Sequence, residues 1–199
     1  MTTKLTLLPL NLIVLLFSLC SITQLQAATN NPFDTHPVRY AVVNDLAIAY
    51  QDMGPKTGEP VLLIMGLGAQ MLHWGNETTQ GLISKGYRVI AFDNRDAGLS
   101  QKLYQADVPR VWWAMLQSKM GWQVETTYTL TDMAADAIGV LDTLKITQAH
   151  IVGASMGGMI AQRCAIGYPD RLLSMTSIMS SSGAPDLPRP SPEVSAQLL

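Results

Sequence analysis

The chain has 199 residues, a formal net charge of −2 and two cysteines. This length suits one domain with a substantial core, and the mildly acidic balance, without a basic cluster, argues against a nucleic-acid-binding protein. Only Cys164 lies outside the N-terminal 27 residues, so a disulfide-stabilised scaffold is excluded once those residues are removed.

The N-terminal segment has the residue order of a secretory signal peptide. Lys4 precedes a mostly apolar stretch over residues 5–19, and Ala27 provides the small residue that a cleavage site requires. Because the apolar stretch is shorter than the ~20 residues that span a bilayer, we expect residues 1–27 to be cleaved after Ala27. The mature protein is then expected to be secreted or periplasmic, with no stable membrane span. A lipoprotein signal through Cys20 is disfavoured because a bulky leucine precedes that cysteine.

Strands and helices alternate along the rest of the chain after an opening β-hairpin. Short, continuous apolar runs indicate strands buried on both faces of a parallel sheet, and longer segments have apolar residues at helical spacing. Thr131 is the expected N-terminal cap of the helix that begins near residue 130. The predicted elements are strands over residues 38–43, 46–51, 61–65, 88–92, 149–152 and 172–179, and helices over residues 71–85, 130–144 and 158–168. This order predicts an α/β fold, with a mostly parallel sheet, helices on both faces and an N-terminal antiparallel hairpin.

Two segments interrupt this alternation. Residues 101–129 carry three of the four tryptophans, and we expect a helix over residues 109–119 within this segment. The tryptophans are expected to pack in the core; lining of an apolar pocket is less favoured, and contact with a membrane surface is least favoured. Residues 180–199 are rich in serine and proline and are expected to be the poorly ordered start of a lid. The expected division is therefore a signal peptide over residues 1–27, a core over residues 28–179 and this final segment.

The pentapeptide Gly153-Ala154-Ser155-Met156-Gly157 stands between a predicted strand and a predicted helix. In that context G-x-S-x-G is a nucleophile elbow, a strained turn that lifts the serine hydroxyl above the edge of the sheet. Gly153 and Gly157 let the strand and helix approach closely, because a Cβ there would clash. Ser155 is therefore the candidate nucleophile, at a helix N-terminus whose free N–H groups favour negative charge.

Three motifs together resemble those of the α/β-hydrolase superfamily, in particular its esterase-like members. The motifs are MGLGAQ over residues 65–70, DNRDAGLS over residues 93–100 and GASMGG over residues 153–158. The resemblance implies that Ser155 attacks a small ester-like substrate to form an acyl-enzyme. It also implies an oxyanion hole made by the backbone N–H groups of Leu67, which follows Gly66, and of Met156, with no cofactor or metal.

The groups that would activate Ser155 are not where the resemblance implies. In this superfamily the acid and the histidine follow the serine along the chain, whereas His36, His73 and His150 all precede it. Asp186 is the only late acid candidate. We therefore expect the chain to be truncated before the lid, the acid and the histidine, to have little activity, and to leave its last strand as an exposed apolar edge.

Two other classes of function remain open. A dinucleotide-binding domain would suit Gly66-x-Gly68 after a strand and Asp93 at the end of the next strand, but Met71 stands where the third glycine belongs. A non-catalytic protein on a hydrolase scaffold is the other alternative. Among enzymes, lactone, amide or C–C bond hydrolysis and perhydrolysis would use the same serine. The oligomeric state is not indicated.

Overall fold

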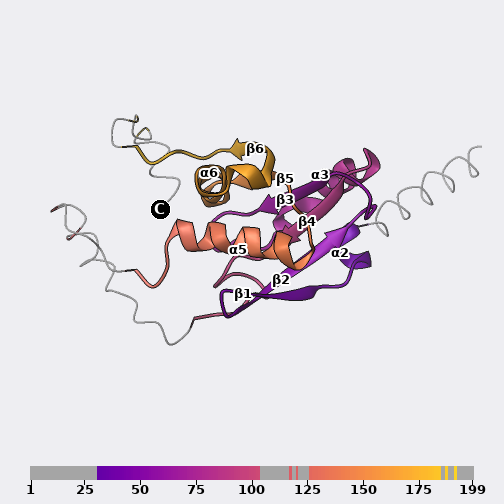
Figure 1. Cartoon of the computed structure of the whole chain (residues 1–199), viewed down its shortest axis with the longest axis horizontal. Coiled ribbons are helices and arrows are strands. Elements are labelled where there is room, and N and C mark those ends of the chain that lie inside the picture. The colour runs from indigo at the N-terminus through magenta and orange to yellow at the C-terminus, as the bar shows by residue number, and fades with distance from the viewer. Residues whose placement is uncertain are drawn as a thin grey trace, which may run out of the picture.

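The structure is a computed structural model that describes residues 31–103, 117, 120, 126–184, 187 and 191. Within these residues, the strands form one sheet in the order β1-β2-β4-β3-β5-β6 (Figure 1). The strands are β1 (Arg39–Val43), β2 (Leu46–Met53), β3 (Pro60–Ile64), β4 (Arg88–Phe92), β5 (Ala149–Ala154) and β6 (Leu172–Ile178). β2 pairs antiparallel with β1 and β4, and the other neighbours pair parallel. This confirms the mostly parallel sheet with an antiparallel hairpin at its N-terminal edge.

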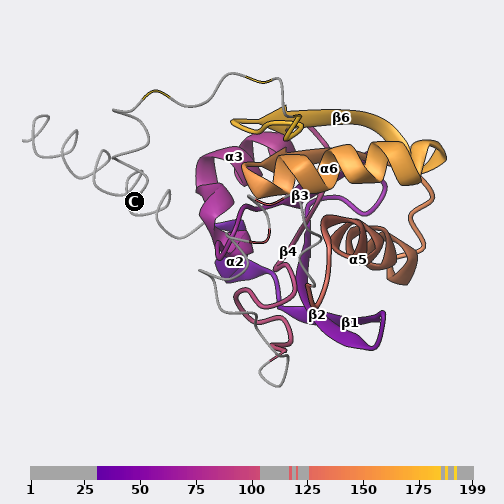
Figure 2. The same cartoon turned by 90° about the vertical axis from the view of Figure 1, so that its left-hand side faces the viewer.

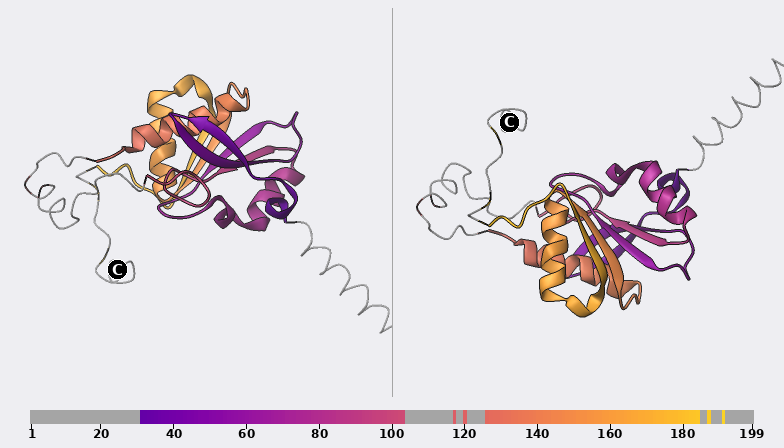
Figure 3. Two further views of the ribbon diagram at one scale, coloured as in Figure 1. Left: turned by 90° about the horizontal axis from the view of Figure 1, so that it is seen from below. Right: turned by 90° about the horizontal axis from the view of Figure 1, so that it is seen from above.

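Helices cover both faces of the sheet. α5 and α6 lie together on one face, and α3 lies on the other face with α2 beside it (Figures 2 and 3). The helices are α2 (Pro32–Thr35), α3 (Gly75–Ser84), α5 (Leu130–Thr143) and α6 (Met156–Gly167), with 3₁₀ turns η1 (Met71–Trp74) and η2 (Pro169–Arg171). No helix among the described residues is long and apolar enough to cross a membrane.

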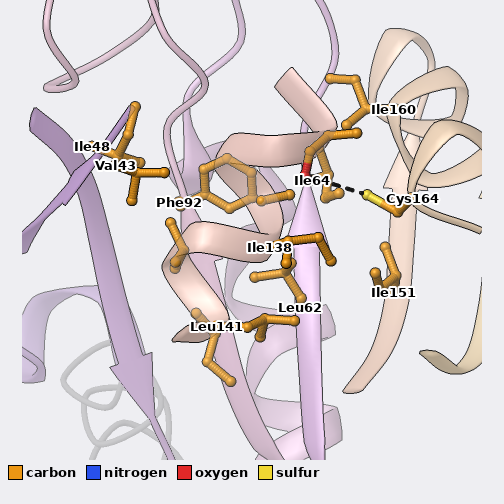
Figure 4. Packing of buried hydrophobic residues seen from close by; sticks show 14 of the residues in the cluster. Val43, Ile48, Leu62, Ile64, Phe92, Ile138, Leu141, Ile151, Ile160 and Cys164 are labelled. Carbon is orange, nitrogen blue, oxygen red and sulfur yellow. Dashed lines mark hydrogen bonds between the residues drawn. The ribbon is translucent and has the colours of Figure 1, made fainter. Parts of the chain in front are cut away.

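Each face of the sheet has its own apolar core, which explains the continuous apolar runs. Leu62 and Ile64 of β3 pack with α5 and α6, whereas Leu63 between them packs on the α3 side. Figure 4 shows the first of these cores, where Phe92 of β4 lies beside the β3 side chains. Cys164 is fully buried there, and burial raises the pKa of its thiol to about 12. The thiol is therefore a packing group rather than a nucleophile.

Two helix starts differ from the sequence prediction. The helix predicted over residues 71–85 begins as η1 and becomes α3 only at Gly75, whose φ of 71° interrupts the helical backbone. The cap of α5 is Thr129 rather than Thr131. Its hydroxyl accepts from the N–H groups of Thr131 and Asp132, while the carboxylate of Asp132 accepts from the N–H of Thr129. This reciprocal capping box stabilises the earlier start.

Several predictions lie wholly or mostly outside the described residues. These are the signal peptide over residues 1–27, the helix over residues 109–119 and the acid candidate Asp186. Residues 180–199 are described only in part, so the expected lid stays a prediction. The exposed edge is confirmed within the described sheet: β6 is one of its two outermost strands and exposes Leu173, Met175 and Ile178.

Candidate active site

Ser155 forms a sharp turn between β5 and α6. Its backbone has φ 55° and ψ −124°, a combination that non-glycine residues rarely adopt. The turn is held by two hydrogen bonds of 2.9 Å, from the N–H of Ser155 to the carbonyl of Ile178 and from the N–H of Gly158 to the carbonyl of Ser155. Such strain costs ~1–3 kcal/mol and persists where the surroundings enforce it. The geometry is that of a nucleophile elbow.

The glycines around Ser155 are required by close approach of the backbone. A Cβ on Gly153 would lie 2.1 Å from the carbonyl oxygen of Gly157, and one on Gly157 would lie 2.1 Å from that of Ile64. A Cβ on Gly66 would lie 3.0 Å from the Cβ of Ser155 and 3.4 Å from its Oγ. The loop that follows β3 therefore lies directly against the candidate nucleophile.

Leu67 and Met156, the two candidate oxyanion donors, line the same pocket, which has a volume of about 310 Å³. They follow β3 and β5, which are neighbouring parallel strands, and the crevice at the carboxyl ends of such strands is where open α/β sheets bind ligands. Within the described residues, no hydrogen bond engages the N–H of either residue. The structure therefore brings Ser155, the glycines and both candidate donors together.

The polar wall of this pocket is built around a buried ion pair that sequence analysis missed. Arg95 donates from Nε and Nη2 to the carboxylate of Asp136 at 2.6 and 2.7 Å, and Asn44 donates to the same carboxylate at 2.8 Å. Burial opposes the charge of Arg95, but Asp136 outweighs it and raises the pKa of the guanidinium. Asp136 is 1% exposed. In the sequence it is one polar residue of an amphipathic helix, with no signal of its partner.

Tyr128 closes this wall above Arg95, whose guanidinium carbon lies 5.1 Å from the centre of the tyrosine ring. Burial, together with the carboxylate of Asp96, raises the pKa of Tyr128 to about 12. The phenol is therefore neutral at physiological pH and is not a general base for Ser155.

None of the three histidines is hydrogen-bonded to Ser155, and all three lie in the described part of the chain. The Nδ1 atom of His36 lies 2.8 Å from the carbonyl of Pro32, and that of His73 accepts from the N–H of Gln70 at 3.0 Å. His150 contacts Ser174 and Glu59 on the α3 side of the sheet. No group of three His, Cys, Asp or Glu side chains that could hold a metal occurs among the described residues.

Comparison with known proteins identifies the family. A family model for the alpha/beta hydrolase fold matches residues 59–198, which include the loop after β3, the turn over residues 93–100 and the elbow. The chain belongs to the α/β-hydrolase family. The fold and the family that the motifs indicate are thereby confirmed.

Similar proteins of this family are named for different hydrolytic reactions. The chain is 30% identical over 146 residues to rhodomycin D methylesterase of Streptomyces peucetius, a match over 73% of this chain and 43% of that protein. It is 31% identical over 159 residues to the 2-hydroxy-6-oxononadienedioate/2-hydroxy-6-oxononatrienedioate hydrolase of Burkholderia vietnamiensis, over 78% of this chain and 47% of that one. The enol-lactonase of Burkholderia xenovorans matches with a TM-score of 0.53 and 27% identity, over 69% of this chain and 45% of that one. The chain thus spans less than half the length of these relatives.

Proposed function

We propose that this α/β-hydrolase cleaves a carboxylic ester of a small molecule through an acyl-enzyme on Ser155. The observation that carries the proposal is the strained backbone of Ser155 beside the N–H groups of Leu67 and Met156. These two residues line one pocket, and no described residue accepts a hydrogen bond from their N–H groups. Five of the pocket-lining side chains are apolar, which suits an ester with a short hydrocarbon chain; they are Leu67, Ala97, Leu130, Met133 and Met156.

In the proposed reaction, the Ser155 hydroxyl gives its proton to a general base as Oγ bonds to the ester carbonyl carbon. The carbonyl oxygen becomes an oxyanion, which accepts hydrogen bonds from the N–H groups of Leu67 and Met156. One such donor contributes ~3 kcal/mol to the transition state. The intermediate then expels the alkoxide, which takes the proton from the base. Water repeats the sequence on the acyl-enzyme and releases the acid.

The general base is the component that the described residues do not place beside Ser155. Since each histidine is engaged elsewhere, we propose that the base and its orienting acid belong to the part of the relatives' length that this chain does not span. The 199-residue chain is then expected to acylate slowly.

A ligand-binding protein without turnover is the second candidate function. The observation that favours it is the lack of an imidazole bonded to Ser155 among the three histidines of the chain. C–C bond, lactone and amide hydrolysis would use the same serine and oxyanion donors, and would differ from ester hydrolysis in the substrate that the pocket accepts.

Labelling of the full chain with a fluorophosphonate, followed by mass spectrometry of the modified peptide, tests the site. We expect slow modification of Ser155 that disappears in Ser155→Ala and persists in Ser174→Ala. Ser174 is the matched control because its hydroxyl lies 2.7 Å from Nδ1 of His150. Modification of Ser174 instead, or p-nitrophenyl acetate hydrolysis that survives Ser155→Ala, would show that the site is elsewhere.

We also propose that residues 1–27 direct export of the protein. The support is the charged, apolar and small-residue order of this segment. Expression in a bacterial host, followed by N-terminal sequencing of the periplasmic fraction, should give a product that begins at Ala28. A cytoplasmic product that retains Lys4 would contradict the proposal.

A further inference from the structure

Two consecutive residues of the turn after β4 hold both ends of the loop that carries Leu67. Asn94 donates from Nδ2 to the carbonyl of Met65 at 2.8 Å, at the start of the loop. The carboxylate of Asp93 accepts from the N–H of Met71 at 2.6 Å, at its end. The candidate oxyanion donor therefore lies on a short loop that is anchored on both sides.

These anchors are themselves rigidly held. Asp93 is 2% exposed and Asn94 is 3% exposed, so their hydrogen bonds act in a low dielectric, where they are stronger than in water. The second carboxylate oxygen of Asp93 accepts from the N–H of Leu99 at 2.7 Å. The backbone carbonyl of Asp93 accepts from the hydroxyl of Ser100 at 2.6 Å, and that hydroxyl accepts from the N–H of Ala49 at 2.8 Å. The anchor is thus joined to β2 as well as to β4.

Gly98 shows how tightly the Asp93 carboxylate is enclosed. A Cβ on Gly98 would lie 2.0 Å from Oδ2 of Asp93, and Gly98 has a φ of 47°, in the left-handed region. A side chain there would displace the carboxylate that holds Met71. Within the DNRDAGLS motif, Gly98 therefore encloses the Asp93 carboxylate, and Ser100 holds the Asp93 backbone carbonyl.

The Asn94 amide has one engaged end. Its Nδ2 is bonded to Met65, whereas its Oδ1 is buried without a partner among the described residues. A buried unpaired oxygen costs free energy, and the bond from Nδ2 to the Met65 carbonyl offsets part of that cost. If the Asn94 amide were rotated so that its nitrogen and oxygen exchanged places, the oxygen would face the Met65 carbonyl and this hydrogen bond would be lost.

We propose that Asp93 and Asn94 are positioning residues that set the distance of the Leu67 N–H from Ser155. The proposal rests on the proposed function of Ser155 and Leu67. Gly66 transmits the constraint, because it lies between the Met65 anchor and Leu67 and is already in close approach to the Ser155 side chain. An oxyanion donor acts only over hydrogen-bond distance, so a displacement of ~1 Å is sufficient to weaken it.

Two variants of the full chain test this role. Asp93→Asn removes the charge that holds Met71, and Asn94→Leu removes the donor to Met65 with little change of volume. The matched control is Asp52→Asn, which alters a carboxylate that is 7% exposed and bonded to Arg88 at the other end of β4.

The first measurement is native-state hydrogen exchange at the Ala69 amide, which bonds to the Gly66 carbonyl inside the loop. We expect about tenfold faster exchange in Asp93→Asn and Asn94→Leu, as for the loss of one buried hydrogen bond. The β5 amides should be unaffected, and Asp52→Asn should leave Ala69 unchanged. Unchanged exchange in both variants, or an equal rise in the control, would overturn the proposal.

The second measurement is the rate of Ser155 labelling by a fluorophosphonate. We expect the maximal labelling rate to fall at least about tenfold in both variants, with the concentration for half-maximal rate unchanged, because the anchors act on the oxyanion donor rather than on ligand binding. If Asp93 and Asn94 had only a structural role, the variants would have a lower melting temperature, but the maximal labelling rate would not fall selectively. If the unmodified chain does not label, the proposed function of Ser155 fails, and exchange at Ala69 still decides whether Asp93 and Asn94 position the loop.

Discussion

Ser155 follows β5 and Ser174 lies in the neighbouring strand β6. Each serine has a different part of the arrangement that a serine hydrolase needs. Ser155 has the strained turn and, in the described part of the chain, two neighbouring N–H donors without an acceptor, but none of the three histidines is bonded to it. Ser174 of β6 has the imidazole of His150 at 2.7 Å and, through it, the carboxylate of Glu59, but it lies within a strand of the sheet rather than in a sharp turn. A hydroxyl, an imidazole and a carboxylate that are hydrogen-bonded in series do not by themselves make a catalytic site. The proposed role of Ser155 rests on the backbone N–H donors beside it, because such donors can stabilise a developing oxyanion.

The ion pair between Arg95 and Asp136, in the wall of the pocket that Leu67 and Met156 line, gives the largest expected effect on stability. Asp136→Ala leaves Arg95 buried and unpaired, so we expect the free energy of unfolding to fall by about 4 kcal/mol. The control is Asp142→Ala in the same helix, whose pair with Arg171 is largely exposed and contributes about 0.5 kcal/mol. Urea unfolding followed by circular dichroism measures both. Equal losses would show that the buried pair gives the pocket wall no special support.

The elbow glycine Gly157 gives the next largest effect. In Gly157→Ala the new Cβ meets the carbonyl oxygen of Ile64 at 2.1 Å, and we expect a loss of about 3 kcal/mol together with loss of Ser155 labelling. Gly167→Ala in the same helix is the control, because nothing lies within 4 Å of its Cβ. That variant should unfold at the same or a slightly higher urea concentration. An elbow that tolerates Gly157→Ala would remove the geometric argument for Ser155.

The hydrogen bond between Ser174 and His150 is expected to contribute to stability alone. Ser174→Ala and His150→Gln each break a partly exposed hydrogen bond and should each cost about 1 kcal/mol, with coupling between them in a double-mutant cycle. The rate of Ser155 labelling should not change in either variant. A slower rate would mean that His150 acts on Ser155, and the contrast between the two serines would fail.

The smallest expected effect is the pH dependence of the stability that Asp52 contributes to the sheet, which carries both serines. Burial alone would raise the pKa of Asp52, but hydrogen bonds and charges from Arg88 and Lys56 outweigh it and hold that pKa below its ordinary value. A carboxyl with a lowered pKa in the folded state stabilises the fold above its unfolded pKa of about 4, and this contribution is lost as the pH falls through the folded-state pKa.

Asp52→Asn should therefore be less stable than the unmodified chain at pH 6, with a difference that shrinks below pH ~4. Urea unfolding at pH 6, 4 and 3 measures the difference. A difference that stays constant with pH would show that the carboxylate charge does not stabilise this end of β4.

Local patterns accounted for most of the fold and for the elbow. The apolar runs of β3 and β4 and the turn at Asn44-Asp45 depend on neighbouring residues, and both central residues of that turn adopt the positive φ that a two-residue hairpin requires. The elbow was predictable for the same reason, since its glycines and serine lie within five residues.

The contacts that shape the pocket were not predictable, because their partners are far apart in the sequence. Arg95 and Asp136 are 41 positions apart, and Asn94 and Met65 are 29 apart. The cap at Thr129 was missed because it depends on a reciprocal bond with Asp132 rather than on the identity of the capping residue alone. The start of η1 depends on the Asp93 carboxylate, which accepts a hydrogen bond from the N–H of Met71, 22 positions away in the sequence.

The hydrogen bond from the N–H of Ser155 to the carbonyl of Ile178 links the Ser155 turn to β6, one of the two edge strands of the described sheet. Edge strands open by local fluctuation far more often than the whole domain unfolds. Each time the end of β6 frays, Ser155 loses a contact that holds its strained conformation, while the strands at the centre of the sheet stay paired. We therefore expect the hydrogen bond between Ser155 and Ile178 to open more often than those between the central strands.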